Sequence, residues 1–160
     1  MIRPRLFGHP LHPITVGFPV ALWTVGLVWD LAALLRARPL WSEMAFWTLA
    51  AGLMAAVPAL ITGFWEMMAL PQGHAAEGKV WWHMGIMSAA FCCILVSVLL
   101  RQEALSSGVQ APGSAFVTAL AGVALTLAGG WLGGELVFGH GVGVENRKER
   151  NGDEPSLDDA

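Results

Sequence analysis

The sequence contains few charged residues and no tyrosine. Charged residues make up only 13% of its 160 positions, whereas soluble domains contain about a quarter. The few Lys and Arg residues do not form a basic patch with interleaved aromatic residues, so nothing indicates nucleic-acid binding. With a mean hydropathy of +0.56, the composition excludes an ordinary soluble domain.

Cysteine is also scarce, and the two cysteines present are the neighbours Cys92 and Cys93. Vicinal side chains on a helix point about 100° apart, so they are poor disulfide partners. We expect both to be small apolar residues that face lipid or a neighbouring helix.

Long apolar runs are what the sequence has in abundance. They cover residues 14–35, 44–70, 80–100 and 114–138, and each reaches the roughly 20 residues that span a bilayer. The sequence therefore predicts an all-α integral membrane protein, an antiparallel four-helix bundle. Residues 1–13 are expected to form an interfacial segment and residues 144–160 a disordered acidic tail.

Four spans place both termini on one side of the membrane, which we call side A. Six of the nine Lys and Arg residues fall near side A, and cytoplasmic loops are rich in such residues. We therefore expect cytoplasmic termini in a multi-pass protein of the cell membrane.

The same topology gathers all five histidines on side A, together with two glutamates. Imidazole ligates Zn, Cu and Fe, and two imidazoles on different helices can hold a haem. We predict a haem b or a transition-metal ion at this mouth of the bundle, with His12 and His83 as ligands. The reserve residues are His9 and His140 as further ligands, and Glu135 and Glu66 as carboxylates that orient the ligands.

Each of these residues also has a structural interpretation. Pro10 and Pro13 disfavour a regular helix around His12, and we expect this segment to fold over the bundle mouth. His74 is expected to be a solvated loop residue. Glu135 lies among glycines, where we expect it to be buried with a histidine or arginine partner.

Asp30 stands apart, near the opposite end of the first run. An intramembrane carboxylate is a functional candidate, and its structural alternative is pairing with Arg36 or Arg101. In the last run, Gly129 and Gly133, like Gly130 and Gly134, form small-xxx-small pairs that allow another backbone to approach closely.

Two motifs together carry a family resemblance: Gly8-His9-Pro10-Leu11-His12-Pro13 at the start, and Gly133-Gly134-Glu135-Leu136-Val137 with His140-Gly141-Val142-Gly143 at the end. With Asp30 and His83 they make the chain resemble the bacterial DUF2231 family of predicted four-helix membrane proteins. The resemblance implies a bacterial inner membrane but no particular activity. Members often carry a histidine where this chain has Gly17, and some relatives are joined to Rieske-type iron–sulfur or cytochrome modules.

The leading hypothesis is a membrane electron-transfer subunit that passes electrons between a quinone and a soluble redox protein. The alternative is a non-catalytic scaffold or partner subunit, in which the small-residue face and acidic tail dock another protein. A third class is a transporter or proton path that uses Asp30, Glu66 and Glu135. We expect lipid contact and assembly into a homo-oligomer or larger complex, and no catalytic residue is predicted.

Overall fold

The computed structural model describes residues 5–7 and 9–143. A short antiparallel β-hairpin comes first, with β1 (Arg5–Leu6) paired to β2 (His9–Pro10). The helices that follow are α1 (Leu11–Arg36), α2 (Pro39–Met68), α3 (Glu77–Leu100), the short α4 (Gln102–Ser107) and α5 (Gly113–His140).

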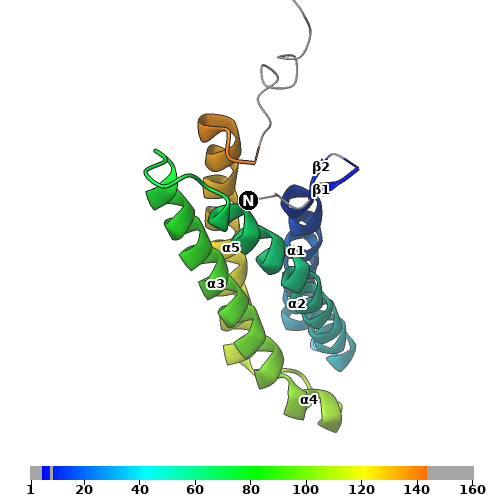
Figure 1. Cartoon of the computed structure of the whole chain (residues 1–160). Helices are drawn as coiled ribbons and strands as arrows, with labels where there is room; N and C mark the ends of the chain where they lie inside the picture. The colour runs from blue at the N-terminus through cyan, green and yellow to red at the C-terminus, as the bar shows by residue number, and fades with distance from the viewer. Residues whose placement is uncertain (1–4, 8, 144–160) are drawn as a thin grey trace, which may run out of the picture.

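The four long helices form two antiparallel hairpins that lie side by side (Figure 1). One hairpin joins α1 to α2, and the other joins α3 to α5. Contacts within each hairpin are far more extensive than contacts between them, and α1 borders α2 and α5 whereas α3 borders α5 and α2. The predicted four-helix bundle is confirmed, with α4 at the end of the bundle opposite the β-hairpin.

Each long helix is apolar enough to cross a membrane. The four candidate spans are 26 to 31 residues long, and each contains an apolar stretch of 18 residues with at most two charged side chains. Large apolar side chains cover the outside of the bundle, including Trp131 and Phe138, which are 81% and 91% exposed. Such a surface suits lipid and not water.

The first helix begins earlier than the sequence predicted, at Leu11 and not at Ile14. His12 and Pro13 therefore lie in its first turn, and the expectation that this segment stays off-helix is wrong. Pro13 is tolerated because backbone N–H groups in the first turn have no partner within the helix.

The connections on side B, the side opposite side A, also hold more helix than predicted. Pro39 starts α2 inside the predicted polar link, because its fixed φ suits a first helical position. The link after α3 contains α4, which ends at Gly108 with a left-handed φ of 64°.

The interior is packed through small residues. A Cβ added at Gly52 of α2 would lie 2.5 Å from the Trp23 ring, and one at Gly122 of α5 would lie 2.7 Å from Ile94. Large side chains of α1 and α3 thus rest directly on neighbouring backbone, which is how membrane helices gain packing contacts.

Candidate functional site

The side-A half of the bundle contains a partly open, mostly apolar cavity of about 410 Å³. All four long helices contribute to its walls, and Trp23 and Phe91 pack edge to face at its inner end, with ring centroids 6.5 Å apart. Among the described residues, His12 and His83 are the histidines that line it. The cavity therefore contains both of the ligands preferred from the sequence.

His12 is held by α2. Its Nδ1 lies 2.9 Å from the carbonyl oxygen of Ala59, and its ring packs on Gly63, one turn further along α2. A Cβ at Gly63 would lie 2.7 Å from the His12 Cε1, closer than real contacts allow. The ring position therefore depends on a residue without a side chain.

His83 is held by α5 in the same way. Its Nδ1 lies 2.8 Å from the carbonyl oxygen of Gly129, and its ring packs on Gly133, one turn further on. A Cβ at Gly133 would lie 3.0 Å from the His83 Cε1. Each of the two hairpins thus holds one imidazole with the same hydrogen bond to a carbonyl oxygen and the same contact with a glycine.

This geometry fixes which ring nitrogen is available. A carbonyl oxygen can only accept a hydrogen bond, so each Nδ1 carries the proton and donates it. In a neutral ring Nε2 then keeps its lone pair, which can ligate a metal or accept a hydrogen bond. We expected carboxylates to orient the histidines. In the structure, the backbone carbonyl oxygens of Ala59 and Gly129 accept the hydrogen bonds that orient the two rings.

The reserve histidines lie outside the cavity. His9 is exposed on β2, and His140 lies in the last turn of α5 with its Nδ1 3.2 Å from the Glu135 carbonyl oxygen. His74 lies in the α2–α3 loop, where its Nδ1 accepts a hydrogen bond from the Ala76 N–H at 3.1 Å.

The two glutamates differ in position. Glu135 is exposed and forms an ion pair with Lys79, so the expectation that it is buried beside a histidine or arginine is wrong. It points away from the cavity because α5 turns its glycines inward instead. Glu66 lines the cavity.

The glycines of α5 are used within the chain. Gly129 packs against Met87 and Gly133 against His83, whereas Gly130 and Gly134 form part of the cavity wall. Gly129 and Gly133 are thus covered by side chains of α3, whereas Gly130 and Gly134 border open space.

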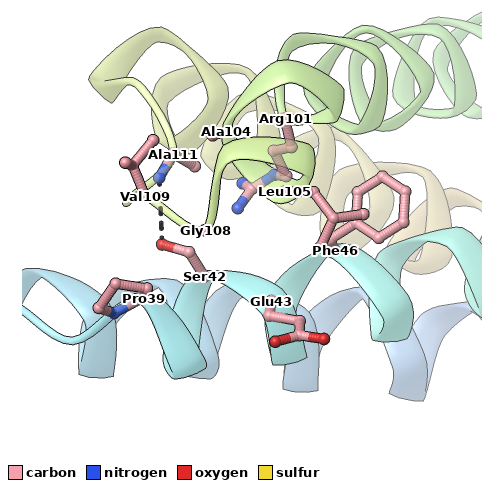
Figure 2. A pocket seen from close by; sticks show the side chains of 10 residues that line it. All are labelled: Pro39, Ser42, Glu43, Phe46, Arg101, Ala104, Leu105, Gly108, Val109 and Ala111. Atoms are coloured by element: carbon pink, nitrogen blue, oxygen red, sulfur yellow. Dashed lines mark hydrogen bonds between the residues drawn. The ribbon is translucent and has the colours of Figure 1, made fainter.

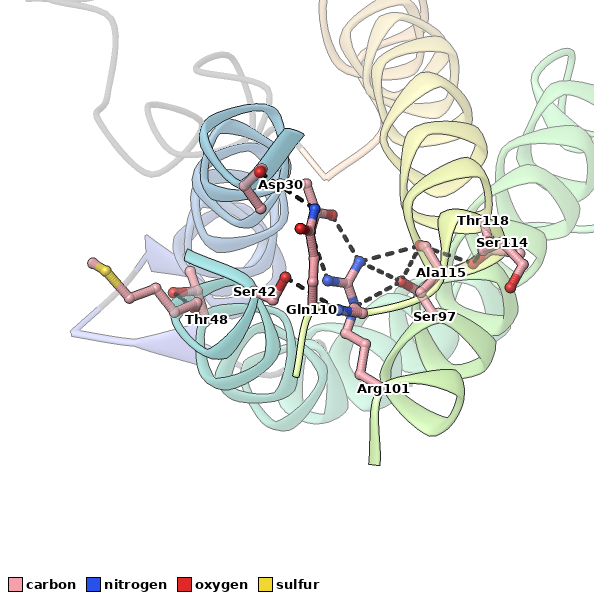
Figure 3. Close-up of polar contacts among 12 residues, drawn as sticks. Asp30, Ser42, Thr48, Ser97, Arg101, Gln110, Ser114, Ala115 and Thr118 are labelled. Carbon is pink, nitrogen blue, oxygen red and sulfur yellow. Dashed lines mark hydrogen bonds and ion pairs between the residues drawn. The ribbon is translucent and has the colours of Figure 1, made fainter. Parts of the chain in front are cut away.

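Asp30 pairs with Arg101, one of its two predicted partners, near side B (Figure 3). The two carboxylate oxygens accept from Nη1 and Nη2 at 2.6 and 2.7 Å, and both residues are almost fully buried. Arg101 also donates to the Ser97 hydroxyl and to the Ala115 carbonyl oxygen. With both carboxylate oxygens engaged, Asp30 is a structural residue and not part of the cavity.

A second, much smaller hollow of about 30 Å³ lies beside Arg101 (Figure 2). It is bordered by α2, α4 and the chain after α4, where the Ala111 N–H donates to the Ser42 hydroxyl at 3.3 Å. This volume accommodates about one water molecule, so the hollow is not a ligand site.

Metal ligation by side chains alone has little support. Within residues 5–7 and 9–143 no three His, Cys, Asp or Glu side chains come together as a metal site. The site defined by the structure is thus a pair of imidazoles and the Glu66 side chain in a mostly apolar cavity.

The fold and site define a four-span membrane protein with a histidine-lined cavity. Residues 8–146 match the family model described as predicted membrane protein (DUF2231), so the chain belongs to that family. No curated protein and no solved structure matches the chain.

Proposed function

We propose that the chain is a membrane electron-transfer subunit that holds a haem b between His12 and His83. The observation that carries this proposal is the matched pair of imidazoles lining one cavity, each with its Nδ1 on a backbone carbonyl oxygen. This hydrogen bond fixes the tautomer that leaves Nε2 for a ligand role, and it makes the imidazole a better donor.

A haem fits this donor set better than a bare metal ion. Two protein ligands are too few for a closed zinc or copper site, whereas a haem iron takes four ligands from its macrocycle and needs two more. The cavity volume lies within the range of cofactor and ligand pockets, and its walls are mostly apolar. A haem held by His12 and His83 would supply one-electron chemistry, because the two imidazoles would leave the iron no position for a substrate.

The chain's own residues have distinct roles in this proposal. His12 and His83 supply the ligand nitrogens, the Ala59 and Gly129 carbonyls orient them, and Gly63 allows close approach. Apolar walls exclude water and lower the local dielectric, which tunes the potential of a bound group. The site's place near side A suits exchange with a membrane quinone and with a soluble redox protein, which remain the proposed partners.

The experiment is an optical spectrum together with iron, copper and zinc analysis of the detergent-purified protein. A Soret band with about one iron per chain supports the proposal. Absence of both a Soret band and stoichiometric metal overturns it.

A further inference from the structure

The two hairpins of the bundle occupy equivalent positions in sequence and structure. Along α1 and α3 a constant offset of 71 positions relates residues with the same role: His12 and His83, Trp23 and Ile94, Asp30 and Arg101. The first pair lines the cavity, the second packs on glycine, and the third forms the buried ion pair.

The second helices repeat the same pattern. Ala45-Phe46-x-Thr48-x-x-Ala51-Gly52 of α2 recurs in α5 as Ala115-Phe116-x-Thr118-x-x-Ala121-Gly122. The two threonine hydroxyls each donate to the carbonyl four residues earlier, at 2.7 and 3.0 Å. Such agreement in residue and contact identifies an internal repeat of about 70 residues.

Contacts between the repeats are those of a two-fold arrangement. The helices α1 and α3 run in one direction and α2 and α5 in the other, so the axis that relates the hairpins runs along the bundle. Equivalent residues touch each other only beside such an axis. Asp30 and Arg101 are equivalent and in contact (Figure 3), which places the ion pair beside this axis.

Because the ion pair lies beside the axis, the charges of Asp30 and Arg101 decide which hairpins can pair. Two copies of the first hairpin paired in this way would bury two aspartates together, and two copies of the second would bury two arginines. Like charges repel each other strongly in a buried site unless one of them is neutralised. Only the pairing of one hairpin of each kind gives a neutral, hydrogen-bonded centre.

We infer that Asp30 and Arg101 are the pairing determinant of two equivalent hairpins, and that they position the hairpins relative to each other. The inner surface of the first hairpin recognises the second hairpin of the same chain and discriminates against a second copy of itself. One buried polar contact that fixes partner choice is an established device in helical assemblies. This inference holds whatever the cavity binds.

The test exchanges the charges of the equivalent residues Asp30 and Arg101 in the full-length chain. Spin labels on Phe18→Cys of α1 and Trp82→Cys of α3, both exposed and outside the cavity wall, report the distance between hairpins by pulsed electron resonance. Cys92→Ala and Cys93→Ala remove the native thiols. The compared changes are Asp30→Arg, Arg101→Asp and both together, with Glu135→Lys at the exposed ion pair as the control.

Each single change is expected to replace one narrow distance peak by a broad distribution, and the double change to recover the narrow peak. The control should leave the peak unaltered. If the single variants do not fold, the double variant is expected to restore a folded monomer on size exclusion. A double variant as broad or as unfolded as the single ones overturns the inference, as do single variants that keep the wild-type peak.

Discussion

His12 and His83 occupy the same position in their respective hairpins, and the rings of both line one cavity. Each Nδ1 donates to a backbone carbonyl at 2.8 to 2.9 Å, four residues before the glycine on which the ring packs. The helices that carry them, α1 and α3, are not adjacent in the bundle but lie diagonally across it. Two like donors thus line one cavity from two helices that are not neighbours.

The glycines beneath the two imidazoles give the first prediction. Gly63→Ala is expected to displace His12 and lower the bound cofactor per chain, because the added Cβ would lie 2.7 Å from Cε1. Gly133→Ala should act on His83 in the same direction but more weakly, since its contact is 3.0 Å.

The readout for these two variants is the absorbance of bound cofactor relative to protein. Gly85→Ala on α3 is the matched control, because a Cβ there meets nothing within 4 Å. Equal cofactor content in all three variants and the wild type would contradict the role given to Gly63 and Gly133.

The buried ion pair gives the second prediction. Arg101→Met is expected to lower the free energy of unfolding by about 3–5 kcal/mol, because it leaves the Asp30 carboxylate buried without its partner. Adding Asp30→Leu should recover most of this loss, since an apolar pair of similar size avoids the cost of a buried charge.

These stabilities can be measured by denaturant titration of the protein in mixed micelles, followed by tryptophan fluorescence. The account fails if Arg101→Met unfolds at the wild-type midpoint, because the ion pair would then contribute nothing to the fold.

The remaining side-A histidines give the third prediction. His9→Ala and His140→Ala are expected to keep wild-type cofactor content, because neither residue lines the cavity. His12→Ala and His83→Ala should each lower it at least several-fold. The measurement is iron per chain after purification, and a loss in His9→Ala that matches the loss in His12→Ala would show that the ligands are wrongly assigned.

The exposed Lys79–Glu135 ion pair gives the fourth prediction. Glu135→Gln is expected to leave cofactor content and unfolding midpoint close to the wild type, because solvent-exposed ion pairs contribute little. Spectra and thermal unfolding of the variant check this directly. A marked loss of cofactor would contradict this prediction and show that Glu135 contributes to the site.

Much of the fold could be predicted from hydropathy alone. The four apolar runs are long and contain few charges, and lipid leaves backbone groups without partners, so each run must cross as a helix. Short connections between successive crossings then make neighbouring helices antiparallel. The helix ends were less predictable. Pro10 and Pro13 were interpreted as breaking the helix, although the first turn accommodates proline.

The site was only partly predictable for a similar reason. Topology placed His12 and His83 at one end of the bundle, but a sequence does not show which way a side chain points around its helix. Glu135 follows two glycines and was expected to face inward with them, yet it faces outward and those glycines face the cavity.

One signal in the sequence would have identified the site residues. The recurrence of Ala-Phe-x-Thr-x-x-Ala-Gly at 45–52 and 115–122 aligns the two halves, and that alignment pairs Gly63 with Gly133. In the first helices of the two halves the offset is 71, one residue more, and it matches His12 with His83 and Asp30 with Arg101. His9, His74 and His140 have no histidine equivalent at either offset. Comparison of the two halves of the chain therefore identifies His12 and His83, which the number of histidines on side A alone does not.

The most direct test of the central claim is the reduced-minus-oxidised spectrum of the wild type, His12→Ala and His83→Ala, each with and without carbon monoxide. The account predicts a wild-type Soret band that carbon monoxide does not shift, because His12 and His83 would both ligate the iron and leave no position for carbon monoxide. Each variant should either lose the band or become sensitive to carbon monoxide. A wild type without a Soret band, or variants whose spectra match the wild type, would contradict the account.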